Sequence, residues 1–261
     1  MHSDYEDYAI HWVPRAGSAL AAFGAGWTGW CAERGVSSDL PEFRRMRRGR
    51  PEMPGPGALL GLHAVLKEPF RLARGRTVWA MDTELMALAQ SLPAVRLPRF
   101  EVTVFDGQVV LALSRPSRPI VRLTRYIEDL VKPLQAGPRY ARYSGDWDVS
   151  GINLPGQRAW VEPEPTPVAR FHVPLSDRME LGLAFEMVDD LTPALNAILD
   201  ESQFLSDIAL VGNPGRGRPW RLIERYSLAE EPTRHGVRAP RGMACKGPSL
   251  FAPLDTGFAI V

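Results

Sequence analysis

The chain has 261 residues, 45% of them hydrophobic, and its 31 Lys and Arg residues nearly balance 30 Asp and Glu residues. This length and apolar content allow a sizeable buried core. The balanced charge excludes a whole-molecule field that would draw the protein onto nucleic acid or an anionic membrane, so any attraction for phosphate must be local.

The cysteine content and the hydropathy of the chain indicate the cellular compartment to expect. Cys31 and Cys245 are too few and too far apart for a disulfide framework or a zinc site with recognisable ligand spacing. The start "MHSDYEDYAIHW" lacks the basic residues and apolar core of a signal peptide, and no run of about 20 apolar residues could span a bilayer. We therefore expect a cytoplasmic protein without a membrane segment, a metal or a cofactor.

The first predicted elements are a strand and a helix. The alternating run "YAIHWV" over 8–13 favours β structure, and Ser18 is a good helix N-cap. The following segment "SALAAFGAGWTGWCAER" predicts an amphipathic helix, with one stripe made of Leu20, Phe23, Trp27, Trp30 and Cys31. The polar, Pro- and Gly-rich segment after this helix is typical of a loop.

From residue 58 the chain follows one order of elements twice. The first copy starts with a strand over 59–66 that carries His63, and it continues with a helix that begins at Asp82 or Thr83. It ends with the strands "FEVTVF" and "QVVLALS", which an Asp-Gly hairpin turn connects.

The second copy starts with the strand "VARFHVPL", which carries His172. A helix follows with Thr192 as its cap and Pro193 in its first turn. The copy ends with "FLSDIALV", a glycine-rich turn and "PWRLIERYSL". A further helix over about 119–134 joins the two copies.

The repeated order predicts an α+β fold with two pseudo-symmetric lobes. Each lobe would be a mainly antiparallel sheet with helices outside, and the lobes would face across a central cleft. We expect one bilobal domain over 1–228, with lobe repeats at about 58–118 and 168–228. Residues 229–261 would form a C-terminal extension.

The two histidines occupy equivalent positions in the two copies. Because side chains alternate along a strand, His63 shares a face with Lys67, and His172 shares a face with Ser176. Facing lobes would bring both imidazoles together, as phosphodiester chemistry requires. One histidine would take a proton from the attacking hydroxyl or water and the other would protonate the leaving oxygen, each worth about 10²–10⁴-fold. A lone histidine in a strand is usually a core or surface residue, so the prediction depends on the pair.

Three stretches carry a resemblance to a known family: "YAIHWVPRAGSALAAFGAGWTGW", "GLHAVLKEPFRLA" and "RFHVPLSDRM". They resemble blocks of the phosphonate metabolism protein family, a branch of the two-histidine phosphoesterase (LigT-like) superfamily. The resemblance covers about residues 6–135 and 169–228. It implies two lobes around a cleft and metal-independent action on cyclic phosphodiesters or 2′–5′ linkages. The superfamily signature, found once in each lobe, is His, any residue, Thr or Ser, then an apolar residue.

Both copies of this signature depart from the pattern. Val65 in "HAVL" and Pro174 in "HVPL" stand where the superfamily has hydroxyls that donate to phosphate oxygens. Losing one donor to a developing oxyanion costs about 2.7–4 kcal/mol in well-studied cases, so cations would have to compensate. The strand faces suggest two ligand-binding residues, and the family's arginine positions suggest two more. The predicted site therefore has a catalytic pair, His63 and His172, and four ligand-binding residues, Lys67, Ser176, Arg71 and Arg178.

More than one function is compatible with these residues. The first is a metal-independent phosphoesterase-like protein that acts on a small cyclic or sugar phosphodiester, linked by the resemblance to phosphonate metabolism. The second is a catalytically degenerate relative that binds a phosphorylated ligand or a partner, and a plain interaction protein is a third. The expected partner is a small phosphorylated ligand. Nucleic acid is expected only as a short or cyclic-phosphate end, although "FRRMRRGR" over 43–50 is locally basic. The sequence specifies no oligomeric state.

Overall fold

A computed structural model describes residues 5–38, 60–136, 171–200, 202–215 and 218–229. The basic run, the middle of the glycine-rich turn and the predicted C-terminal extension after residue 229 lie outside the described residues. Within the described ranges, no helix is long and apolar enough to cross a membrane.

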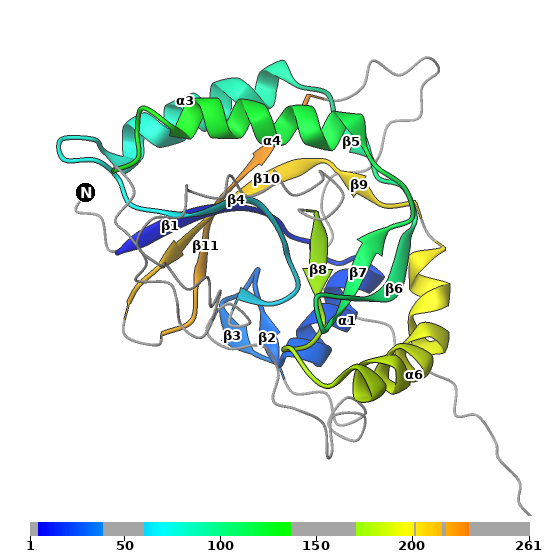
Figure 1. Cartoon of the computed structure of the whole chain (residues 1–261). Helices are drawn as coiled ribbons and strands as arrows, with labels where there is room; N and C mark the ends of the chain where they lie inside the picture. Colours follow the sequence, from blue (N-terminus) through cyan, green and yellow to red (C-terminus); the bar gives the residue numbers. More distant parts are fainter. Residues whose placement is uncertain (1–4, 39–59, 137–170, 201, 216–217, 230–261) are drawn as a thin grey trace, which may run out of the picture.

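Helices and strands alternate along the chain (Figure 1). The helices are α1 (Ala19–Thr28), α3 (Val78–Ser91), α4 (Arg118–Val131) and α6 (Leu181–Leu199). The strands of the first half are β1 (Asp7–Trp12), β2 (Trp30–Cys31), β3 (Val36–Ser37), β4 (Ala64–Phe70), β5 (Val95–Arg96), β6 (Phe100–Phe105) and β7 (Gln108–Leu113). Those of the second half are β8 (His172–Pro174), β9 (Phe204–Leu205), β10 (Asp207–Asn213) and β11 (Arg221–Ser227).

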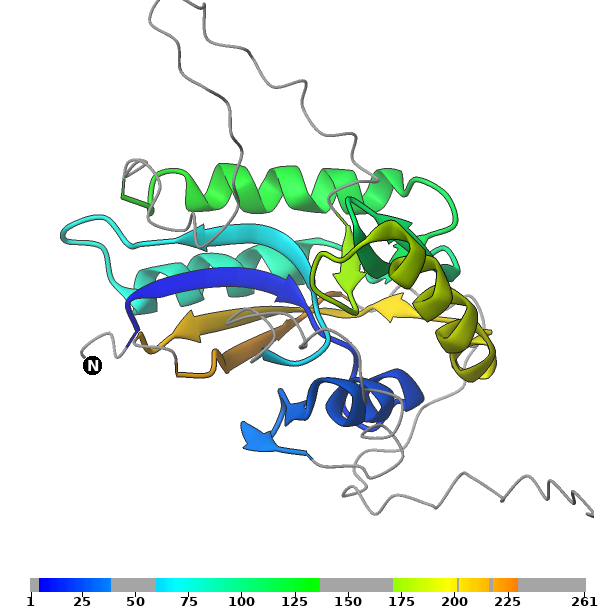
Figure 2. The same ribbon diagram turned by 60° about the horizontal axis from the view of Figure 1, so that its bottom comes forward.

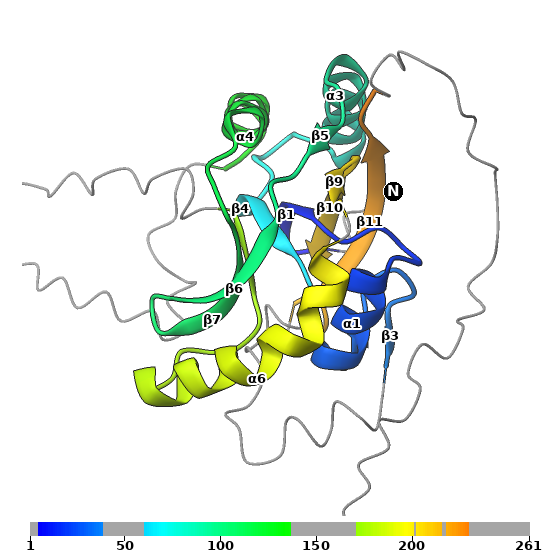
Figure 3. The same ribbon diagram turned by 90° about the vertical axis from the view of Figure 1, so that its right-hand side faces the viewer.

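Two antiparallel sheets carry the architecture. The larger has the order β11-β10-β1-β4, and the smaller has the order β6-β7-β8. Helices α3 and α4 lie on one side of the molecule, and α1 and α6 lie on the other, with the strands between them (Figure 3). The prediction of an α+β fold with two lobes of antiparallel strands and outer helices is confirmed.

The two sequence repeats exchange their strands between the two sheets. From the first repeat, β4 and α3 belong to the larger sheet and its helix layer, whereas the hairpin β6–β7 forms the smaller sheet. From the second repeat, β8 and α6 join that smaller sheet, whereas β10 and β11 belong to the larger one. Each lobe is therefore built from both repeats, and neither 58–118 nor 168–228 forms a lobe alone.

One hydrophobic core connects the helix-covered faces of both sheets. Trp12 of β1 packs against Phe100 of β6 and against Phe171, at ring-centroid distances of 5.6 and 5.9 Å. These aromatic contacts connect the two sheets, and the strands β4 and β8 also contact each other (Figure 2). Both β4 and β8 are edge strands, so the lobes join through side chains and not through a continuous hydrogen-bond ladder.

Two helix boundaries differ from the prediction because local capping residues set them. Helix α1 ends at Gly29, whose φ of 73° suits a glycine C-cap, so the next two residues form β2 instead of extending the helix. Helix α3 begins after Thr77, whose hydroxyl accepts from Ala80 N, and so it starts before the predicted Asp82 or Thr83.

Helix α6 differs most from the prediction. The sequence places its cap at Thr192, but the helix begins after Glu180 and runs through Pro193. Its buried face explains the extra length, because the core-facing residues continue through both halves, namely Ala184, Met187, Leu191, Leu195 and Leu199. The Thr192 hydroxyl, predicted to cap the helix, donates to Val188 O within it.

Candidate active site

Helix α1 and two glycines fix the chain just before His63. Gly61 has a φ of 89°, and a Cβ on it would lie 3.1 Å from Trp30 O, so this position requires glycine. A Cβ on Gly24 would lie 2.6 Å from Leu62 Cβ, so α1 packs against the residue beside His63 only because it has glycine there. The predicted strand over 59–66 contains His63. In the structure β4 begins at Ala64, so His63 lies immediately before this strand.

Both predicted catalytic histidines face away from the shared core. Ala64 and Leu66 of β4 are buried in that core, as are Phe171 and Val173 on either side of His172. Because side chains alternate along a strand, His63 and His172 occupy the opposite faces of their strands, and both are half-buried. The packing of β4 against β8 places these two faces next to each other.

The environment of His63 favours its neutral form. Burial lowers the pKa of His63, the hydrogen bond to Gly61 O raises it in part, and the nearby charge of His172 lowers it. His63 Nδ1 lies 2.8 Å from Gly61 O, and a carbonyl oxygen can only accept, so Nδ1 carries the proton in this bond. The lone pair of the neutral ring is therefore on Nε2.

His172 is positioned by the smaller sheet. It pairs with Ala112 in the register of β7 and β8, and its ring lies 5.2 Å from that of Phe105. Pro174 closes β8 opposite Val110 without a register shift. Because β8 is an edge strand, the N–H that proline lacks is not needed for the sheet.

Lys67 is the predicted cation that shares the strand face of His63. It is half-buried, and it pairs across β4 and β1 with Ile10. Val65 is also half-buried. A register shift separates the Ile10–Lys67 pair from the His11–Val65 pair, and Ile10 belongs to the buried core, so simple alternation does not extend the face of His63 and Val65 to Lys67. At about 3.3 Å per residue, Lys67 lies up to about 13 Å along the strand from His63.

Two predicted ligand-binding residues have other tasks in the structure. Arg71 lies at the far end of β4 from His63, up to about 26 Å along an extended chain, and its Nε donates to Asp7 Oδ1 at 2.8 Å. The Ser176 hydroxyl is buried, where it accepts from Val109 N at 2.9 Å and donates to Asp177 O at 2.9 Å. Neither side chain is thus placed to hold a ligand beside the histidines.

Arg178 is the fourth predicted ligand-binding residue, and a carboxylate already engages it. Its guanidinium forms an ion pair with Asp106 at the hairpin turn of β6 and β7. Asp106 directly follows Phe105, whose ring contacts that of His172. The ion pair between Arg178 and Asp106 is therefore close in sequence to a residue that contacts His172. A phosphate would have to compete with Asp106 for Arg178.

A third histidine lies at the site that the sequence reasoning did not single out. His11 of β1 is only 5% exposed, and its ring stacks on that of His63 at a centroid distance of 4.5 Å and an interplanar angle of 14°. Burial, and secondarily the charge of His63, lowers the pKa of His11 well below its ordinary value. The sequence signal that could have identified His11 is its place as a polar residue among the apolar and aromatic residues of "YAIHWV" over 8–13.

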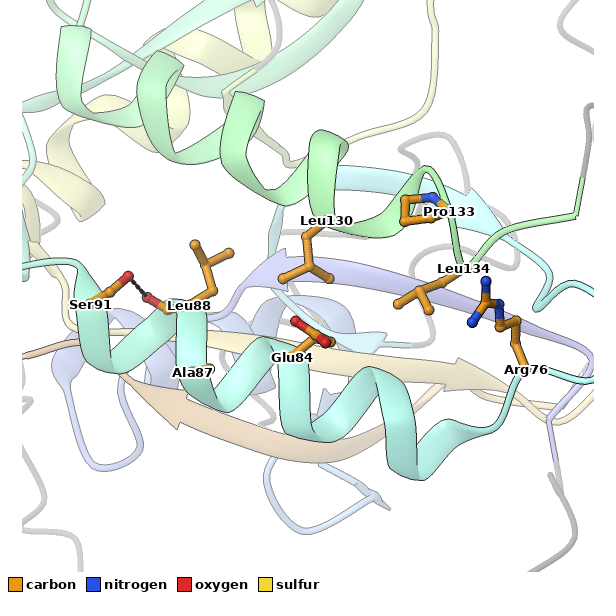
Figure 4. A pocket seen from close by; sticks show the side chains of 8 residues that line it. All are labelled: Arg76, Glu84, Ala87, Leu88, Ser91, Leu130, Pro133 and Leu134. Carbon is orange, nitrogen blue, oxygen red and sulfur yellow. Dashed lines mark hydrogen bonds between the residues drawn. The ribbon is translucent and has the colours of Figure 1, made fainter.

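Two shallow pockets among the described residues lie away from the histidines. One of about 480 Å³ lies between α3 and α4, where Leu88 and Leu130 face each other and Glu84 lines the wall (Figure 4). The second, of about 330 Å³, lies between α3 and β11, where Tyr226 donates to Asp82. No histidine lines either pocket. Within the described ranges, no group of three or more His, Cys, Asp or Glu residues could hold a metal ion.

A family model described as a protein of unknown function, DUF1045, matches residues 65–221. This span is more than half of the chain. The chain belongs to this family. The matched DUF1045 region includes His172 and begins two residues after His63. No curated protein matches the chain.

Solved structures of phosphoesterases are similar to this DUF1045 chain. The structure of E. coli LigT with 3′-AMP is 14% identical, with a TM-score of 0.41, and covers 86% of this chain and 99% of its own. The apo form of E. coli LigT is 13% identical, with a TM-score of 0.42, over 86% and 98%. A further structure, described as a phosphoesterase, is 12% identical, with a TM-score of 0.41, over 86% and 99%. At these values, substrate and mechanism must come from the residues of this chain.

Proposed function

We propose that this protein binds a small phosphorylated ligand where β4 meets β8, and that it acts on a cyclic or sugar phosphodiester with His63 and His172 as the acid/base pair. The observation that carries the proposal is the state of His63. Its Nδ1–H is held by Gly61 O, and burial together with His172 lowers its pKa. A neutral ring with its lone pair on Nε2 has the form that a general base needs near pH 7.

In this proposal His63 acts as the general base and His172 acts as the general acid. His63 Nε2 removes a proton from water while the water oxygen forms a bond to phosphorus. The bond from phosphorus to the ester oxygen breaks, and a protonated His172 gives its proton to that leaving oxygen. His63 ends protonated and His172 ends neutral, so one proton exchange with solvent restores both. The scheme needs no metal. Half-buried Lys67 supplies positive charge farther along β4.

A second function is favoured by the two replaced hydroxyls. With Val65 and Pro174 on the histidine faces, neither strand offers the side-chain donor of the signature to a transition-state oxygen. The site could then bind a phosphorylated ligand without turnover. The link to phosphonate metabolism rests on the motif resemblance alone.

The test is a turnover panel in the presence of a chelator. The compounds are 2′,3′-cyclic nucleotides and cyclic ribose phosphates, with product followed by ³¹P NMR, and the proteins are the parent, His63→Ala and His172→Ala. We expect each histidine variant to lose about 10²-fold or more of the parent rate. Lys132→Ala is a matched control, because Lys132 is exposed at the C-cap of α4.

The outcomes separate the two functions. Equal turnover by the parent and His63→Ala would refute the acid/base proposal. Without turnover, saturable stabilisation of the parent by one of these compounds, or by the 3′-AMP or ATP named for the E. coli LigT structures, supports the binding function if both histidine variants lose it. The double variant Val65→Thr, Pro174→Thr adds a further distinction, since a weak enzyme gains rate from the restored donors and a binding protein has no rate to gain.

A further inference from the structure

His11 is a polar ring in an apolar environment. Its neighbours on the same face of β1 are Ala9 and Val13, and its cross-strand partners are Ala209 of β10 and Val65 of β4. The adjoining cluster of buried residues is hydrophobic. Neither Nδ1 nor Nε2 of His11 has a hydrogen-bond partner among the described residues.

A purely structural role does not account for this residue. Buried polar atoms in native proteins are almost always hydrogen-bonded, and an unpartnered one opposes folding. The neighbouring Trp220, with its ring centroid 6.3 Å from that of His11, shows that large rings pack in this region. A phenylalanine would fill the position of His11 without carrying two unpartnered nitrogens.

The position of His11 connects it with the catalytic pair. Its ring is nearly parallel to that of His63 at 4.5 Å, so the two imidazoles form one stack. Nearly parallel stacked rings do not direct their nitrogens at one common ion, which is consistent with the lack of a metal-binding group among the described residues. Its cross-strand partner on β4 is Val65, where this chain lacks a hydroxyl. A neutral imidazole always retains one N–H, so His11 is a hydrogen-bond donor next to the position of the missing donor.

We propose that His11, the third histidine of the site, is a ligand-binding residue, and that its ring N–H donates to a phosphoryl oxygen of the ligand beside Val65. The inference rests on the proposed function, because it requires a phosphorylated ligand at the histidines. It extends that function by assigning the compensating donor to β1, a strand outside both sequence repeats. Bound ligand then supplies the partner that the buried ring of His11 lacks.

The test compares the parent with His11→Phe and His11→Gln. Affinity for 3′-AMP and for 2′,3′-cyclic AMP is measured by calorimetry, and stability by urea unfolding without ligand. We expect His11→Phe to be at least as stable as the parent yet to bind about 10- to 100-fold more weakly, the factor for a hydrogen bond to a charged group. His11→Gln keeps an N–H donor and should bind more tightly than His11→Phe. A structural role predicts lower stability with unchanged affinity for the folded protein.

A second readout keeps the inference testable if His11→Phe does not fold. The imidazole ¹⁵N signals of His11 are assigned in the parent as those that His11→Gln removes. Addition of 3′-AMP should shift them, and unmoved signals in the ligand-bound parent would overturn the inference while leaving the proposed function intact. Equal affinity of folded His11→Phe and the parent would do the same. If the parent binds no compound of the panel, the proposed function fails and the role of His11 fails with it.

Discussion

Acidification should destabilise this protein more steeply than its His11→Phe variant. The pKa values of His11 and His63 are both lowered by burial in the folded chain, whereas each is near 6.5 in the unfolded chain. Below pH 6.5 the unfolded state therefore binds protons that the folded state does not. Stability is fully present above this value and is lost as the pH falls below it.

The pH-dependent loss of stability has an upper limit, which follows from the pKa of histidine in the unfolded chain. A histidine that stays neutral in the folded state and titrates at 6.5 in the unfolded state costs about 2 kcal/mol between pH 8 and pH 5. Removing the ring of His11 should therefore reduce the pH-dependent loss by up to about 2 kcal/mol, and the carboxylates contribute equally to both proteins.

The assay is urea unfolding followed by tryptophan fluorescence, at half-unit steps from pH 8 to pH 5. The quantity compared is the difference in unfolding free energy between the parent and His11→Phe at each pH. This difference should change by up to about 2 kcal/mol in favour of the variant as the pH falls, mostly below pH 6.5. A difference that stays constant over this range would refute a neutral, buried His11.

Three further outcomes follow from contacts at or near the site. Ser176→Ala should lower stability by about 1–3 kcal/mol, because Val109 N–H loses its buried acceptor, with no change in ligand affinity by calorimetry. Gly24→Ala should cost about 1–3 kcal/mol in urea unfolding, because its Cβ would meet Leu62 Cβ at 2.6 Å, and a variant as stable as the parent would contradict this close packing. If the protein turns over a substrate, the acid limb of its rate profile should lie below pH 6.5, since the pKa of His63 is lowered; a limb above pH 6.5 would contradict His63 as the base.

Local signals predicted the elements whose geometry depends on neighbours in sequence. The hairpin of β6 and β7 matches its prediction, and Asp106 and Gly107 have the positive φ values of 51° and 73° that an Asp-Gly turn accommodates. Helix α4 also follows the predicted apolar period, with Ile120 and Ile127 buried. Pro193 misled the prediction of α6, because burial of a long apolar face outweighed one missing hydrogen bond.

The sequence by itself determined that the chain repeats a His-bearing strand, and alternation along β4 and β8 was enough to turn both histidines away from the core. Only the tertiary structure decided which polar residues accompany them. In the folded protein Arg71 donates to Asp7, the Ser176 hydroxyl accepts from Val109 N, and the ring of His11 stacks on that of His63. The reason is that such partners come from neighbouring strands that lie far apart in the sequence. Spacing along the chain sets which face a side chain occupies, but the neighbour it meets there depends on which strands pair and in what register.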